Sequence, residues 1–339
     1  MSLRPSRVAV AAWLMLMLTL LPGLAFATCG AEGCPCVRRG LSDNAGRFMF
    51  DVRVLDVRQD ELVLGNAPIS LPDAMASSGA HHHIPLRTWT RAWSLESAMR
   101  VSDRLRLSLN VPYVEREHVR YDNHTATYDP ALVQSWRFHG IGDAVLQAQF
   151  RVGALEGGPR ATVQAGVKLP TGRRQVERTT GIFPATLQPT LRPGSGSTDL
   201  LAGVSLSQAL PWAPVLPLSL NVLHRWNGRG TDDYRAGDET QVSLSSGWAV
   251  KPWLTLTGLV NASAHASDSW TGPTASDPYR EPSHAGARAL FLTPGVSASV
   301  APGMTVYALL QNRVWGHCDQ PMVVARHYLL VGSSVSFGD

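Results

Sequence analysis

Polar and apolar residues alternate along much of the chain, and residues 161–169 show the pattern clearly. Every second residue there is apolar, and the residues between are Thr162, Gln164, Gly166 and Lys168. Successive side chains of a β-strand point to opposite faces, so this strand would have one apolar and one polar face. The apolar face must meet either a protein core or lipid, and that choice decides the fold.

Alternating segments of this kind recur about twelve times along the chain. They span residues 46–58, 86–101, 104–115, 142–153, 160–170, 198–210, 216–227, 240–250, 253–265, 287–300, 303–315 and 323–337. Most are about ten to fifteen residues long. That is longer than the roughly five or six residues of an ordinary soluble strand, and it is enough to cross a bilayer at a tilt.

The links between these segments alternate in length. The links after the even-numbered segments are short, as at residues 102–103 and 251–252, and those after odd-numbered segments are long and polar. The last link, residues 316–322, is intermediate. Short periplasmic turns opposite long extracellular loops are typical of outer-membrane barrels. We therefore predict an all-β, up-and-down antiparallel transmembrane β-barrel of about twelve strands over residues 46–339, with both termini periplasmic. A soluble sandwich with its polar face outward is the alternative.

The start of the chain has the features of a secretory signal. Two arginines precede an apolar run, and an A-x-A cleavage motif follows at residues 25–27. We expect a signal peptide over residues 1–27 and a cysteine-containing periplasmic segment over residues 28–45. A lipoprotein signal at Cys29 is the weaker alternative, because the residues before it lack the small, leucine-led context. Outside the signal, no apolar run approaches the roughly 20 residues that a membrane-spanning helix needs.

Charge and motif content narrow the classes of function. Charged residues make up 17% of the chain, below the roughly 25% of soluble proteins. The net charge of +4 falls to +2 without Arg4 and Arg7, which is too small to indicate a nucleic-acid partner. The sequence has no G-x-S-x-G, Walker, dinucleotide-binding or H-E-x-x-H motif. We therefore expect no enzyme, and an outer-membrane location in a Gram-negative bacterium.

The end of the chain carries a candidate assembly signal. Gly332, Val335 and Phe337 follow the glycine-x-x-apolar-x-aromatic spacing of bacterial outer-membrane barrels. Leu330 stands at the usually polar position, and two residues follow the aromatic one. The spacing predicts that the barrel-assembly machinery recognises this end, with membrane lipid as the other partner of the barrel.

Four motifs resemble those of a known family. They are NVPYVER, FHGIGDAVLQAQF, AGVKLPTG and LRPGSGSTDLLAGVSLSQAL, and they follow one another over roughly residues 104–210. The chain resembles the porin-like outer-membrane barrels of the meta-pathway phenol-degradation family. The resemblance implies the barrel fold, the outer-membrane location and transport of a hydrophobic or aromatic compound.

If the apolar faces meet lipid, the alternate side chains line a lumen. The pore-lining candidates are Arg104, Arg106, Gln147, Gln149, Arg151, Arg160, Gln164, Lys168, Arg225 and Arg313. Basic residues predominate among them, and Asp143 at one rim is the acidic residue that alternates with them in the third to fifth segments. Uncompensated cations would favour anions. We therefore predict a porin-like channel or transporter for small solutes, either hydrophobic and aromatic or anionic.

Cysteines and histidines form the other candidate sites. Cys29, Cys34 and Cys36 favour a disulfide among themselves in an oxidising periplasm, with metal or redox chemistry as the alternative. A second group lies in the first and last long loops, which closure of the barrel would make neighbours. Its side chains could bind zinc or copper, and the alternative is that they are simply solvated. This group is His81, His82, His83, His317 and Cys318. The two alternative functions are therefore a metal-handling barrel and a structural or adhesion barrel with a plugged lumen, and we expect no other cofactor.

Overall fold

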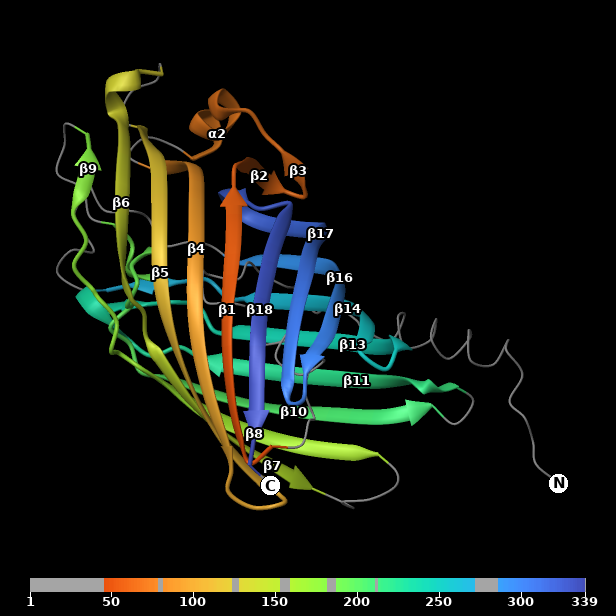
Figure 1. Ribbon diagram of the computed structural model, residues 1–339. Coiled ribbons are helices and arrows are strands. Elements are labelled where there is room, and N and C mark those ends of the chain that lie inside the picture. Colours follow the sequence, from red (N-terminus) through yellow and green to blue (C-terminus); the bar gives the residue numbers. More distant parts are fainter. Residues whose placement is uncertain are drawn as a thin grey trace.

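The computed structural model describes residues 46–78, 82–123, 128–152, 159–181, 187–210, 213–271 and 286–338. Within these ranges, twelve strands form a closed antiparallel barrel (Figure 1). The wall strands are β1 (Phe48–Gln59), β4 (His82–Arg100), β5 (Leu105–Asn123), β7 (Ala144–Val152), β8 (Arg160–Leu169), β10 (Asp199–Leu210), β11 (Ala213–Trp226), β13 (Glu239–Lys251), β14 (Leu254–His265), β16 (Ala287–Ala301), β17 (Met304–Val324) and β18 (His327–Phe337). The predicted fold class and strand number are confirmed.

The barrel closes where the first wall strand meets the last. β1 pairs with β4 along one edge and with β18 along the other, so its backbone groups are used on both sides. A closed barrel leaves no strand edge, so the backbone N–H and C=O groups are hydrogen-bonded within the wall, where the lipid offers no water as a partner. The wall between β5 and β8 is divided, because β7 pairs with the first part of β5 and β6 (Val133–Ile141) pairs with the later part.

Side-chain burial along the wall strands is the reverse of that in a soluble protein. Within β4, Leu95 is 50% exposed, while its neighbour Glu96 is 5% exposed and faces the interior. Large apolar side chains such as Val52 and Leu329 are likewise exposed on the outer face. An apolar outside and a polar inside suit a barrel in lipid. This arrangement excludes the soluble sandwich, whose polar face would be outward.

The two ends of the barrel differ in their connections. The ends of β1 and β18 lie together, because the Arg47 amide donates to the Gly338 carbonyl at 2.8 Å. We call this the terminal end, and it also holds the short turns at residues 101–104 and 302–303. The opposite end, the loop end, holds the long connections (Figure 1). Both chain ends of the barrel therefore lie on one side, as the even strand count predicts, and their periplasmic location stays a prediction.

Short elements cover the loop end. They are β2 (Glu61–Gly65), β3 (Ala67–Pro68), α2 (Leu71–Ser78), η2 (Pro130–Leu132), β9 (Arg178–Thr180), η3 (Pro189–Leu191), η4 (Thr231–Asp233), β12 (Tyr234–Arg235) and β15 (Ser269–Trp270). α2 packs Ala74 against Ile84 and Tyr121, which face outward on β4 and β5. This part of the outer wall is therefore covered by protein. In the described part of the chain, no helix is long and apolar enough to cross a membrane.

Three wall strands extend further toward the loop end than the sequence predicts. β4 and β5 have 19 residues each, and β17 has 21. Residues 316–322, predicted to be a link, belong to β17, and a tight turn at residues 325–326 follows instead. Residues 116–123 belong to β5 although they are rich in charge, because Arg116, Arg120 and Asp122 face inward and are buried, while Glu117 on the outer face pairs with Arg87. Polar composition was therefore a poor marker of loops here.

Candidate functional site

An apolar stripe runs along the interior on the strands that close the barrel. Its side chains are inward-facing and come from β16, β17, β18 and β1, where the alternate residues face lipid. The stripe consists of Leu55, Val57, Ala289, Phe291, Leu309, Tyr328 and Leu330. The rings of Phe291 and Tyr328 meet edge to face, with centroids 5.5 Å apart. The lumen of this barrel is therefore not polar throughout.

A group of charged side chains adjoins the stripe toward the terminal end. Arg53 contacts Asp51 at 3.1 Å and Glu96 at 3.2 Å, and it donates to the Asn110 side chain at 3.0 Å. The Tyr307 hydroxyl donates to Asp51 at 2.7 Å. Two carboxylates face one guanidinium, so these groups together carry a net negative charge. Asp51 was not among the predicted lumen residues, although it alternates with Arg53 in the same segment.

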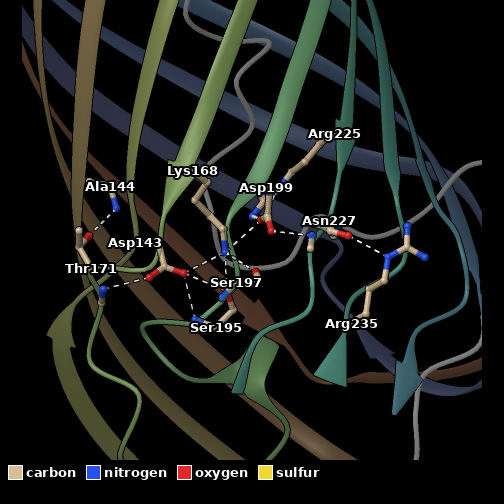
Figure 2. A network of polar contacts seen from close by, with 12 residues as sticks. Asp143, Ala144, Lys168, Thr171, Ser195, Ser197, Asp199, Arg225, Asn227 and Arg235 are labelled. Carbon is tan, nitrogen blue, oxygen red and sulfur yellow. Dashed lines mark hydrogen bonds and ion pairs between the residues drawn. The ribbon is translucent and has the colours of Figure 1, made fainter. Parts of the chain in front are cut away.

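On the opposite side of the barrel in strand order, a buried ion network surrounds Lys168 (Figure 2). The Lys168 ammonium lies 2.9 Å from Asp143 and 3.0 Å from Asp199, and it donates to Ser197 at 3.0 Å. The Arg225 guanidinium donates to Asp199 at 3.0 Å. The Lys168 side chain is 1% exposed, and both carboxylates are fully covered. We call these five residues the Lys168 network.

The network lies where four consecutive wall elements approach the loop end. Asp143 occupies the break between β6 and β7, and the other residues lie at the end of β8, before or at the start of β10, and at the end of β11. Asp143 also accepts from the Gly172 amide at 2.9 Å and the Ser195 amide at 3.0 Å (Figure 2). The network therefore fixes both ends of the connection between β8 and β10.

That connection is described at residues 170–181 and 187–198, and we call it the inward loop because its segment around residues 187–191 contacts the inner face of the wall. Arg116 on the inner face of β5 donates to the Thr190 carbonyl at 3.4 Å and to the Leu191 carbonyl. Leu187 packs against Trp136, which faces inward on β6. A Cβ atom on Gly172 would lie 2.7 Å from the Cα atom of Gly194, so only glycine permits the two ends of the loop to approach this closely. The sequence showed a long loop but not its direction.

The inner face of β4, β5 and β6 beside this loop carries a buried polar array. The His83 imidazole lies 2.8 Å from Asp122, and Gln134 donates to Asp122 at 3.1 Å. Arg120 donates to Gln134 at 3.1 Å, and its guanidinium lies 4.6 Å from the centre of the Trp136 ring. Because these groups contact one another, they form a rigid wall and not a set of free charges.

The predicted pore-lining residues fall into three groups. Gln147, Gln164 and Lys168 are buried on the inner face of the wall, and Arg225 faces inward in the Lys168 network. Arg104 is exposed in the turn before β5, so its assignment to a wall strand was wrong. The remaining candidates, which are half-buried or exposed, are Arg106, Gln149, Arg151, Arg160 and Arg313. A lumen role for this last group stays a prediction.

The Lys168 network also corrects the charge balance expected from the sequence. Lys168 was counted among the uncompensated cations, yet it is paired with two carboxylates. Asp199 was missed, although it begins an alternating segment. The basis for a strong anion preference is therefore weaker than predicted.

The candidate metal ligands have other partners in the described part of the chain. His83 pairs with Asp122 within β4 and β5, and His317 lies 3.1 Å from Asp319. Cys318 is buried in an apolar cluster with Val63. His82 and His83 begin β4, and residues 317–318 lie in β17, so their assignment to loops was wrong.

β2 pairs with β17 at Cys318, so the first and last loop regions are neighbours, as predicted. Among the described residues, no three His, Cys, Asp or Glu side chains are grouped as metal ligands. Cys29, Cys34, Cys36 and His81 lie outside the described ranges. The zinc or copper site and the disulfide therefore stay predictions.

The candidate assembly residues occupy both faces of β18. Val335 and Phe337 are exposed on the outer face, and the Phe337 ring stacks on Phe48 with centroids 5.8 Å apart. Gly332 faces inward, where an added Cβ atom would lie 2.5 Å from the Tyr307 hydroxyl oxygen. The packing of Tyr307 therefore explains the glycine at position 332 without an assembly signal. Recognition of this end by the assembly machinery stays a prediction.

The closed barrel, its apolar outer surface and its charged interior define the class of protein: an outer-membrane β-barrel. A family model described as "Putative MetA-pathway of phenol degradation" matches residues 100–314, which is more than half of the chain. The chain belongs to this family. No curated protein matches the sequence.

Solved structures are similar to this chain in fold. An outer membrane channel from Pseudomonas putida F1 has 12% identity and a TM-score of 0.57, covering 88% of this chain and 97% of its own. The translocator domain of autotransporter NalP from Neisseria meningitidis has 10% identity and a TM-score of 0.48, covering 97% and 98%. The toluene transporter TodX of Pseudomonas putida has 8% identity and a TM-score of 0.42, covering 92% and 96%. At these identities the similarity supports the barrel fold, and the last two scores are too low for further comparison.

Proposed function

We propose that this protein is an outer-membrane channel for small hydrophobic solutes, and that the apolar stripe is the wall along which they pass. The stripe carries the proposal, because the interior of a barrel that passes only ions and sugars is lined by polar side chains. Burial of apolar solute surface against Phe291, Leu309 and Leu330 would lower the free energy of a hydrophobic solute inside the barrel. Membership of a phenol-degradation family supports an aromatic solute.

The three parts of the interior have distinct roles in this proposal. The apolar stripe offers the contact surface for the solute. The Lys168 network and the polar array hold the opposite wall and the inward loop in place. Because these charges are paired with one another, they do not compete with the stripe by attracting hydrated ions into the same part of the lumen.

Uptake by whole cells tests the proposal. A porin-poor Gram-negative host expressing the protein should take up radiolabelled toluene several-fold faster than the same host with an empty vector. Phe291→Ser should remove most of this gain, because it places a hydroxyl in the stripe. The control is Leu292→Ser, which changes the neighbouring side chain on the lipid face of the same strand.

The outcomes separate the alternatives. Ion conductance in a planar bilayer without faster toluene uptake would indicate an aqueous pore and contradict the proposal. The absence of both would favour a structural or adhesion barrel with a plugged lumen. A loss of toluene uptake with Leu292→Ser equal to that with Phe291→Ser would show that the stripe is not the path.

A further inference from the structure

An arc of basic side chains follows the terminal end of four consecutive wall strands. β1, β4, β5 and β7 are neighbours in the wall, and an arginine lies at or directly beside the terminal end of each. We call these residues the arginine arc: Arg47, Arg100, Arg104 and Arg151. Arg47, Arg100 and Arg104 are exposed, and Arg151 is half-buried. In the β4–β5 register Arg100 also lies opposite Arg106, and like charges in this position destabilise a sheet.

The arginine arc differs from the exposed arginines near the loop end in its partners. On the outer face near the loop end, the Arg87 guanidinium lies 2.7 Å from Glu117, and that of Arg91 lies 2.8 Å from Asp56. Among the described residues, no carboxylate lies within ion-pairing distance of the four arginines of the arc. The cations of the arc are therefore available to an anion from outside the chain.

The charge balance of this region stays positive when its whole sequence is counted. Residues 99–106 and 150–161 contain five arginines, and their carboxylates are Asp103 and Glu156. With Arg47, six positive and two negative charges give this region a net charge of +4. The net charge of the entire chain is also +4, so the remaining residues sum to zero. The excess positive charge of the protein is therefore concentrated at one end of the barrel.

The arginine arc lies at the mouth of the lumen. Along β4, Glu96 is on the inner face, and the period of two places Arg100 on the same face. Along β7, Gln147 and Arg151 share the inner face in the same way. Deeper in the lumen, Glu96 already contacts Arg53 at 3.2 Å. Because the inner face points away from lipid, a molecule that covers the mouth suits the arc better than the head groups around the barrel.

A neutral hollow lies beside the arc at the same mouth. It has a volume of about 450 Å³ and lies between the β16–β17 turn and β18. Its hydroxyl groups belong to Ser299, Thr305, Ser334 and Ser336. Ser334 lies opposite Asp51 in the β1–β18 register, which places it on the inner face. The mouth thus combines cations with neutral hydrogen-bonding groups.

We propose that the arginine arc and the hollow bind the acidic surface of a protein on the terminal side of the membrane. Neighbouring strands lie about 4.8 Å apart, so the arc spans about 14 Å over three strand spacings, and a single small anion cannot contact all of it. Arginine binds carboxylates through paired hydrogen bonds. A protein surface supplies several carboxylates at this spacing and neutral groups for the hydroxyls, whereas a phosphate polymer supplies charge alone. A partner bound here covers the terminal mouth, where solutes enter or leave the lumen.

Fluorescence anisotropy of the full-length purified protein in a neutral detergent tests the proposal, with labelled oligoglutamate as the probe at physiological ionic strength. One exposed ion pair changes affinity about 1.4- to fivefold. Replacement of all four arginines of the arc by glutamine should therefore weaken oligoglutamate binding by at least about fourfold. Arg104→Gln alone, in an exposed turn, should weaken it by about 1.4- to fivefold and tests the arc even if the quadruple variant does not fold.

The matched control makes the same change of net charge at the loop end. It replaces by glutamine the arginines Arg58, Arg87, Arg91 and Arg326. This variant should bind oligoglutamate within about 1.4-fold of the wild type. Lys251→Gln should do the same, because Lys251 is exposed at the terminal end on the opposite side of the wall. The gel shift on heating will show that each variant folds.

Three results would overturn the proposal. An equal loss with the loop-end control would show that only the total charge matters. Displacement of the probe by short-chain phosphatidylglycerol at a lower concentration than by unlabelled oligoglutamate would assign the arc to lipid. Binding of polyphosphate more than about tenfold tighter than that of oligoglutamate would assign it to a phosphate polymer. Each result would leave the hydrophobic channel intact, because that function depends on toluene uptake.

Discussion

The two opposite sides of the barrel interior are built on different physical principles. Around Lys168, charged side chains are buried and neutralise one another within hydrogen-bonding distance. Along the apolar stripe, the inward side chains are aliphatic and aromatic, and they make few directional contacts. A buried ion pair holds its partners at fixed positions, because removal of one partner leaves an uncompensated charge. Apolar contacts do not require a partner at a fixed position, so a hydrophobic solute can take the place of one apolar contact after another.

Under the proposed function, this difference assigns structure to one side and transport to the other. The charged side determines where the inward loop lies, since Asp143 and Arg116 both hold its backbone. The apolar side offers a surface of nearly constant character along several strands. A channel for hydrophobic solutes needs both the charged side and the apolar side. An interior that is apolar throughout would pack its own side chains together, and an interior that is charged throughout would bind water in place of the solute.

The largest effect is expected from breaking the Lys168 network. Lys168→Met keeps the length of the aliphatic chain but leaves Asp143 and Asp199 close together and without their shared cation. Loss of one partner of a buried pair costs about 3–5 kcal/mol. We expect the free energy of unfolding in urea, measured by the gel shift of the folded barrel, to fall by about this amount.

Two further variants sharpen this test. Arg160→Met removes an exposed cation from the other end of the same strand, and it should change the unfolding free energy by less than about 0.5 kcal/mol. Adding Asp143→Asn to Lys168→Met should recover part of the loss, because one uncompensated charge disappears. If Lys168→Met is as stable as Arg160→Met, the network is not what holds this side of the barrel.

The second effect concerns the inward loop. Arg116→Met removes the donor to the carbonyls of Thr190 and Leu191, and a hydrogen bond from a charged group contributes about 1.5–3 kcal/mol. The population of detached loop should therefore rise roughly ten- to hundredfold. Limited proteolysis with trypsin measures it at Arg192, which is half-buried and donates to the Leu187 carbonyl at 2.9 Å, so faster cleavage there reports opening of the loop. Arg137→Met, on the outer face of β6, should leave the cleavage rate unchanged.

The strands could be predicted from the sequence because membrane strands are patterned locally. The segment predicted at residues 160–170 is β8, and the one at 253–265 is β14 to within a residue. The period of two fixes which residues share a face, and the shortage of charge indicates lipid. These signals need no knowledge of which strands meet.

The site could not be predicted in the same way. The Lys168 network joins residues far apart in sequence, and no spacing shows that Asp143 and Asp199 converge on one ammonium. The apolar stripe was missed because its strands are apolar on both faces, as at residues 329–331, and the period of two then identifies neither face as the lumen. That two-sided apolar pattern was the available signal, since a barrel with a wholly polar lumen would not have it.

A third effect concerns the loop end, where Tyr234 contacts Gln188 and Asp268. Burial first, and then the charge of Asp268, hold the pKa of the Tyr234 hydroxyl well above its ordinary value of about 10. The stability that the neutral hydroxyl contributes is therefore fully present below pH about 10, and it is lost as the pH rises through the raised pKa of the folded state.

Hydrogen exchange of the Gly237 amide, which donates to Asp268 at 2.7 Å, measures this loss. In the wild type its protection should fall above pH about 10 by more than the intrinsic rate predicts. Tyr234→Phe should begin with about 1 kcal/mol less protection and show no further drop. A parallel fall in both proteins would remove Tyr234 as the cause.

The smallest effect is expected on ion selectivity, and it tests how far the buried ion pairs differ from charges in contact with water. With Lys168 neutralised and Arg104 in a turn, the basic candidates that remain near the terminal end are Arg106, Arg151 and Arg160. These side chains are partly or fully exposed, and charges in contact with water are screened beyond about 10 Å at 0.1 M salt. We expect a weak anion preference in reversal-potential measurements, and Arg151→Glu should move it toward cations at low salt. The shift should shrink as salt rises, and Arg137→Glu on the outer face should not produce it. Two results would contradict this prediction: a clear cation preference in the wild type, or an Arg151→Glu channel with the wild-type selectivity at every salt concentration. Either result would show that these cations lie outside the path of ions, and the apolar stripe would then be the remaining candidate for the permeation path.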